Sequence, residues 1–101
     1  MQFIYFLALT ERLIDDSNWT EEDEMIVSEH FERLSQLKKS GQLILAGKTS
    51  DRDPIGIVIF NARDHDEAVE IMNDDPAIKK GIMLGKLRPY KVVLLSEENN
   101  L

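Results

Sequence analysis

The stretch MIVSEHFERLSQL, residues 25–37, decides the fold because its apolar residues recur at helical spacing. With Ile26 placed at zero and about 100° added per residue, the apolar side chains fall on an arc of roughly 140°. His30 falls inside this arc, one turn from Ile26 on one side and from Leu34 on the other. The pattern therefore predicts an amphipathic helix with an ionisable ring on its buried stripe.

The limits of this helix follow from the residues around it. Thr20 can cap its first turn, and Asp23 stands at the third helical position, where a carboxylate can bond back to the cap. The acidic run 21–24 suits the positive end of the helix dipole, so we interpret it as a solvated helix start rather than a metal site. The helix is expected to run to Ser40, with Gly41 as the terminator.

The segments on either side of this helix predict four strands and a second helix. Strands are expected over residues 3–9, 42–47, 55–60 and 86–95, and the second helix over 62–73. Residues 10–18 are expected to be a polar loop, and 96–101 a polar tail. The order βαββαβ is that of an α+β, ferredoxin-like fold, with a four-stranded antiparallel sheet and both helices on one face. We expect residues 1–101 to form a single domain.

The face of the sheet without helices is predicted to be apolar as well. Along the first strand, one face carries Phe3, Tyr5 and Leu7, and the other carries Ile4, Phe6 and Ala8. In the last strand Val92 and Leu94 alternate with Val93 and Leu95. Because two helices cannot cover both faces, we predict a homodimer built through the bare face.

Composition and charge narrow the classes of partner. The chain has a net charge of −7, so nucleic acid and anionic membranes are disfavoured as partners. The apolar run 3–9 is too short to span a membrane. The chain contains no cysteine, which excludes disulfides and thiolate chemistry and fits a reducing compartment, so a cytoplasmic location is expected.

His30 allows two interpretations. It can be a core histidine that donates a hydrogen bond to a backbone carbonyl, since a buried imidazole needs a partner. It can also be a general acid or base at the bottom of a cleft between helix and sheet. The other histidine, His65, lies in the first turn after Asp64, a predicted helix cap, and is expected to be exposed. No histidines stand at i and i+4, so no metal site is predicted. No cofactor is predicted either.

The second candidate residue is Asp75, in the stretch NDDPAIKKG, residues 73–81. Pro76 is favoured at the first position of a helix and Asp just before it, so Asp75 is expected to cap a short helix. A carboxylate has two oxygens, so it can cap that helix and also face a histidine. The sequence leaves both roles open.

Four segments together resemble the YCII-related (YciI-like) family. They are HFERLSQLKKSGQLILAG (30–47), IGIVIF (55–60), DDPAIKKG (74–81) and RPYKVVL (88–94). This resemblance implies a small, usually dimeric protein with a ferredoxin-like α+β fold. It also implies a functional histidine and aspartate, which match His30 and Asp75. Most family members have no assigned reaction, although one relative removes chloride from a chlorinated hydroxyquinol. The family often has proline where this chain has Lys48, and it is often basic at Arg88.

The leading hypothesis is a lyase or isomerase that uses His30 and Asp75 for proton transfer on a small organic molecule without a metal. Arg88 and Tyr90 alternate onto one strand face and are the predicted substrate-binding residues for an anionic or aromatic molecule. The alternative is a non-catalytic module for small-molecule binding or protein assembly. An enzyme should have a partly open pocket around His30, whereas a module should have His30 sealed and bonded to backbone.

Overall fold

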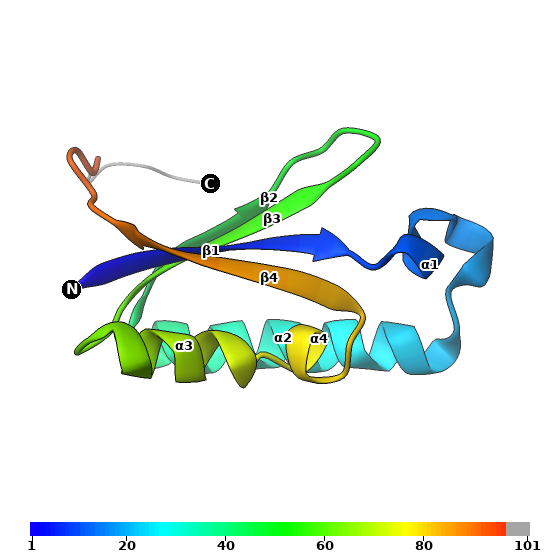
Figure 1. Cartoon of the computed structure of the whole chain (residues 1–101), viewed down its shortest axis with the longest axis horizontal. Coiled ribbons are helices and arrows are strands. Elements are labelled where there is room, and N and C mark those ends of the chain that lie inside the picture. Colours follow the sequence, from blue (N-terminus) through cyan, green and yellow to red (C-terminus); the bar gives the residue numbers. More distant parts are fainter. Residues whose placement is uncertain (97–101) are drawn as a thin grey trace.

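The computed structural model describes residues 1–96 and consists of a twisted sheet with helices packed beneath it (Figure 1). In chain order the elements are β1 (Gln2–Leu9), α1 (Glu11–Ile14), the 3-10 helix η1 (Asp16–Asn18), α2 (Glu21–Lys39), β2 (Leu43–Lys48), β3 (Ile55–Asn61), α3 (His65–Asn73), α4 (Pro76–Lys79) and β4 (Met83–Tyr90). The sheet has the order β2-β3-β1-β4, and each neighbouring pair is antiparallel. The predicted α+β, ferredoxin-like architecture is confirmed.

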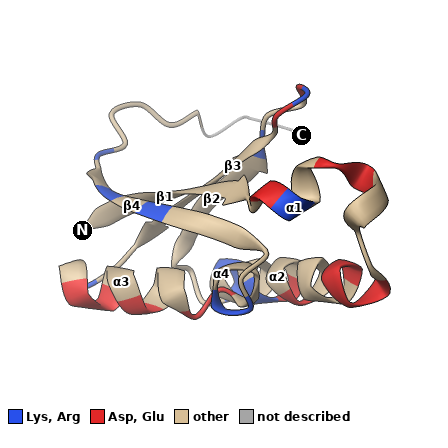
Figure 2. Cartoon of the chain, turned by 45° about the vertical axis from the view of Figure 1, so that its right-hand side comes forward, with Lys and Arg blue, Asp and Glu red and all other residues tan. Residues whose placement is uncertain are grey.

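The core lies between the sheet and the helices α2, α3 and α4, which share one side of it (Figures 1 and 2). Phe3, Tyr5 and Leu7 of β1 point toward these helices and are buried. Leu34 and Leu37 of α2 pack against them from the other side. The alternation predicted for β1 therefore matches the structure.

Helix α2 begins and ends as its sequence predicts. The Thr20 hydroxyl oxygen accepts a bond from the Asp23 backbone N–H at 3.2 Å, and Asp23 Oδ2 accepts from the Thr20 N–H at 2.9 Å. This reciprocal capping box fixes the first turn. Gly41, which follows the helix, has a φ of 85°, a conformation that glycine adopts without a steric penalty. Phe31, at the margin of the apolar arc, is 66% exposed.

The prediction of a polar loop over residues 10–18 is wrong, because this segment contains α1 and η1. Leu13 of α1 is fully buried against Ile26 and Ile82, and Trp19 packs on the same cluster. One buried leucine among many polar residues was enough to anchor a helical turn that periodicity could not detect.

The last strand begins and ends earlier in the chain than predicted. It spans Met83–Tyr90 rather than 86–95, and residues 91–96 have no regular secondary structure. At this end of the strand Tyr90 pairs with Gln2, the first residue of β1. Pro89 lies on the edge strand β4, where a missing N–H is tolerated. The predicted tail lies outside the described residues from position 97 on.

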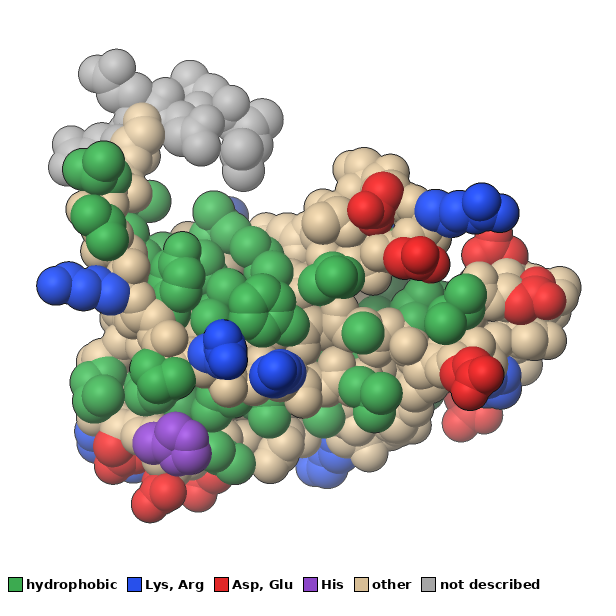
Figure 3. All heavy atoms as spheres, turned by 45° about the horizontal axis from the view of Figure 1, so that its top comes forward, with side chains coloured by type: hydrophobic (Ala, Val, Ile, Leu, Met, Phe, Trp, Pro, Cys, Tyr) green, Lys and Arg blue, Asp and Glu red, His purple; other side chains and the backbone are tan. Residues whose placement is uncertain are grey.

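The other face of the sheet carries apolar side chains that no helix covers. Figure 3 shows them gathered on this open face. Leu84 of β4, Ile55 of β3 and Leu45 of β2 are 66%, 45% and 42% exposed. Such a surface is typical of a contact site, but the homodimer itself stays a prediction. None of the helices within residues 1–96 is both long and apolar enough to cross a membrane.

Candidate active site

His30 projects from the middle of α2 toward the sheet, as its place on the apolar arc predicts. Its neighbours on the stripe, Ile26 and Leu34, are buried with it, and His30 itself is 8% exposed. Its Nδ1 lies 2.7 Å from Asp75 Oδ1. Because an ionised carboxylate can only accept, this contact requires the proton on Nδ1.

Asp75 is fully buried and performs both roles that the sequence left open. As the N-cap of α4, its Oδ1 accepts a hydrogen bond from the Ala77 backbone N–H at 3.0 Å. The same oxygen faces His30. The short helix α4 packs closely on β4, where a Cβ at Gly85 would come within 2.5 Å of Ile78 Cδ1. The glycine therefore lets α4 approach the sheet and bring Asp75 beneath it.

Tyr5 completes the group, and sequence reasoning missed it. Its hydroxyl donates to Asp75 Oδ2 at 2.7 Å. Burial, followed by the negative charge of Asp75 and their hydrogen bond, raises the pKa of Tyr5 well above its usual range. Strand alternation had classed Tyr5 with its apolar neighbours. The available signal was its hydroxyl, because a buried tyrosine usually has a hydrogen-bond partner.

A cavity of about 770 Å³ adjoins His30. It lies between α2, the segment that carries α1 and η1, and the helix-facing side of β1, β2 and β3. The second ring nitrogen of His30, Nε2, has no hydrogen-bond partner within residues 1–96. This atom is not fully buried, so a molecule can reach it. One ring nitrogen is therefore held by Asp75, and the other is left for a molecule in the cavity.

Apolar side chains dominate the cavity walls. The main contributors are Leu7, Leu9, Trp19, Val27, Phe31 and Met83. Two cations and two anions also line it, namely Lys48, Arg52, Asp16 and Asp53. A cavity of this size and character can hold a small organic molecule with an aromatic or aliphatic ring.

The wall formed by α1 and η1 is held to α2 by an ion pair. Arg12 donates to both carboxylate oxygens of Asp23, at 2.9 and 2.8 Å. The hydrogen bond from Arg12, followed by the one from the Thr20 backbone, lowers the pKa of Asp23 well below its usual range. Trp19 Nε1 donates to the Leu13 carbonyl, so the segment is also bonded within itself. The ion pair keeps this wall next to His30.

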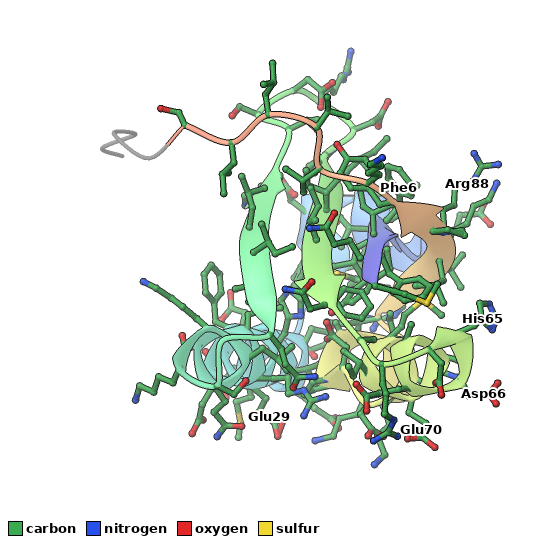
Figure 4. All side chains as sticks on the ribbon, turned by 90° about the vertical axis from the view of Figure 1, so that its left-hand side faces the viewer. Phe6, Glu29, His65, Asp66, Glu70 and Arg88 are labelled. Atoms are coloured by element: carbon green, nitrogen blue, oxygen red, sulfur yellow. The ribbon has the colours of Figure 1, made fainter. Side chains whose placement is uncertain are left out.

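The structure does not bring the other two predicted site residues to this cavity. Arg88 and Tyr90 of β4 pair with Ile4 and Gln2 of β1. Paired residues share a face, so both lie on the open face of the sheet. Figure 4 shows Arg88 pointing outward from β4, away from the helices. Neither residue lines the cavity. His65 is exposed, as predicted.

Comparison with solved structures finds a similar fold in one known enzyme. The 5-chloro-2-hydroxyhydroquinone dehydrochlorinase from Burkholderia phenoliruptrix AC1100, in complex with 2,5-dihydroxybenzoquinone, is similar to this chain with a TM-score of 0.61 and 16% identity. The match covers 90% of this chain and 94% of that one. SnoaB, a cofactor-independent oxygenase from Streptomyces nogalater, aligns with a TM-score of 0.49 and 8% identity over 96% of both chains. At these identities the likeness establishes the fold alone.

Comparisons of sequence give the family. A search of curated proteins found no match. Residues 4–89 match the YCII-related domain, a span that includes Tyr5, His30 and Asp75. The chain belongs to the YCII-related family.

Proposed function

We propose that this protein is an enzyme that transfers a proton on a small organic molecule, with His30 as the general acid and base. The observation that carries the proposal is the environment of the imidazole, which contacts Asp75 through Nδ1 and borders the cavity with its other side. An imidazole held in one tautomer by a carboxylate is a common arrangement for a general base.

The chemistry follows from this tautomer. With the proton on Nδ1, Nε2 has a free electron pair and can take a proton from a carbon or hydroxyl of a bound molecule. The carboxylate of Asp75, 2.7 Å away, stabilises the imidazolium that forms. The ring can then return the proton to another atom, which is isomerisation, or transfer it to a departing group, which is elimination. These steps predict an isomerase or a lyase.

Tyr5 is a positioning residue in this scheme. Its hydroxyl and the Ala77 N–H fix the two oxygens of Asp75, so the carboxylate cannot rotate away from His30. The dehydrochlorinase that shares this fold acts on a small chlorinated ring, a class of molecule that fits a cavity of about 770 Å³.

The alternative function is a non-catalytic binding or assembly module, and the open apolar face favours it. That hypothesis expects His30 to be sealed and bonded to backbone. The partner of Nδ1 is instead a carboxylate, and His30 lines a cavity. These observations support the enzyme. The open face supports a second proposal, a homodimer, which is compatible with catalysis.

Turnover experiments test the catalytic proposal. The full chain is incubated in D2O with enolisable cyclic ketones and with hydroxylated and chlorinated hydroquinones. Deuterium uptake is followed by NMR, and chloride release by ion chromatography. His30→Gln should lower the rate by about 100-fold or more, which is the usual contribution of a general acid or base. His65→Gln is the matched control, because His65 is an exposed histidine outside the cavity, and it should retain the rate. Equal rates in wild type and His30→Gln would refute the proposal.

A further inference from the structure

The charges around the cavity are unusual for so acidic a protein. The chain has a net charge of −7, yet two of the four other charged residues that line the cavity are basic. In Figure 2 acidic residues gather at the η1 segment and at the start of α2. The basic residues Lys48 and Arg52 come from the opposite wall, formed by β2 and the turn that follows it.

Lys48 is the cation that the sheet itself positions. It is the last residue of β2 and pairs with Gly56, which in turn pairs with Leu7 of β1. Leu7 faces the helices, so the register places Lys48 on the same side of the sheet as His30. Gly56 contributes no side chain to cover the Lys48 stem. Within residues 1–96, Lys48 makes no ion pair.

The two acidic residues that line the cavity do not form an ion pair with Lys48 within residues 1–96. Asp53 follows Arg52 in the turn between β2 and β3. Asp16 belongs to η1, on the other wall. Neither carboxylate lies within 4 Å of a lysine or arginine nitrogen in the described part of the chain. Lys48 therefore has a charge available for a ligand at the edge of a largely apolar cavity.

We propose that the cavity takes organic anions, a ring or chain held by the apolar walls with a carboxylate or similar group bound by Lys48. That these anions are substrates, and not only ligands, rests on the proposed function. Lys48 is a specificity-determining residue in it, and His30 acts on the part of the molecule inside the cavity. Lys48 is itself exposed, and a molecule that fills the cavity beside it would displace part of the water around its charge, which strengthens a charge-assisted contact relative to an open surface ion pair.

Binding measurements with a matched pair of probes test this proposal. The full chain is titrated with 2-naphthoate and with its uncharged analogue 2-naphthamide, and NMR follows the His30 imidazole and the backbone amides. Wild type should bind naphthoate about tenfold more tightly than naphthamide. Lys48→Met should remove this preference and leave naphthamide binding unchanged, whereas Lys48→Arg should retain it. Added salt should reduce the preference in wild type.

A control variant and separate readouts make the outcome decisive. Lys39→Met removes an exposed lysine at the end of α2, outside the cavity, and should change neither affinity. Equal affinity for the two probes, no naphthoate binding at millimolar concentration, or equal effects of Lys48→Met and Lys39→Met would each overturn the proposal. Binding that depends on Lys48 without turnover of any compound would refute only the catalytic proposal. Turnover that depends on His30 without a Lys48 effect on binding would refute only this one.

Discussion

His30 Nδ1 lies 2.7 Å from Asp75 Oδ1, although 45 positions separate the two residues in the chain. The contact joins the middle of α2 to the N-cap residue of α4. On the solvent side, Lys80 and Glu29 join the same two helices with an ion pair of 2.9 Å. The buried pair is therefore held by elements that are fixed independently, which is the arrangement that a preorganised site requires.

Replacing Asp75 should destabilise the protein in proportion to the donors left unpaired. Asp75→Ala removes the acceptor of the Tyr5 hydroxyl, the Ala77 N–H and His30 Nδ1 together. We expect a loss of about 3–5 kcal/mol in the free energy of unfolding, because buried donors without partners carry the full desolvation cost. Asp75→Asn keeps one acceptor oxygen and should lose less. Urea denaturation of both variants measures this, and an equal, small effect would contradict it.

Tyr5→Phe should weaken the positioning of Asp75 and keep an aromatic ring in the core. The substitution removes one hydrogen bond to Asp75 and keeps the ring that packs against Phe60. The expected loss is about 1–3 kcal/mol in the free energy of unfolding, the usual value for a hydrogen bond to a charged group. Imidazole NMR should detect a change in His30, since its partner is now held by fewer bonds. An unchanged His30 signal would show that Tyr5 does not position Asp75.

Alkaline pH should destabilise the wild type more than Tyr5→Phe. Burial, followed by the Asp75 charge, raises the pKa of Tyr5 in the folded protein. The unfolded state, with a tyrosine pKa of about 10, therefore releases its proton first. The contribution of Tyr5 to stability is complete below that pH and is lost as the pH rises above it. Melting temperatures measured from pH 8 to 11 should converge for the two proteins, and a constant difference would contradict this.

A residue of the site could be predicted where a short stretch of sequence around it carries a recognisable pattern. Local patterns marked His30 as an ionisable residue on a buried helical arc and Asp75 as a helix cap. The resemblance to the YCII-related family implied that the two form a functional pair. Tyr5 carries no such mark, because alternation along a strand does not distinguish a tyrosine with a buried partner from any apolar residue. Their meeting required the packing of α2 and α4 on one sheet, which no local pattern contains.

Arg88 and Tyr90 illustrate the opposite case. The prediction that they share one face of a strand matches the structure, since both lie on the open face. Which face that is depends on the register between β4 and β1. A one-residue change of register exchanges the faces, and the sequence of β4 does not fix it. The end of β4 was not predicted for a related reason. Its last residue, Tyr90, pairs with Gln2 of β1, and the sequence of β4 does not contain this pairing.

Acid should remove the contribution of the Arg12–Asp23 ion pair, which holds one wall of the cavity. Arg12 lowers the pKa of Asp23 in the folded state, whereas the unfolded value is about 3.9. The ion pair therefore stabilises the protein fully above pH of about 4, and its contribution is lost as the pH falls toward the folded pKa. Asp23→Asn should melt lower than the wild type at pH 7, and the difference should shrink toward pH 2. Asp16, in the neighbouring η1, makes no ion pair within residues 1–96, so Asp16→Asn is the control and should show no such convergence.

The open face of the sheet should hold two chains together through Leu84. This residue is 66% exposed in the single chain and lies on the face opposite the helices. A lysine there would place a charge in an apolar contact between two copies, which is costly without a partner. We expect wild type to sediment with the mass of two chains of 11.6 kDa each at micromolar concentration, and Leu84→Lys with the mass of one. Met25→Lys is the matched control, because Met25 is also 66% exposed but lies on α2, and it should remain a dimer. A wild-type mass of one chain would refute the dimer, and dissociation by Met25→Lys would show that another surface forms it.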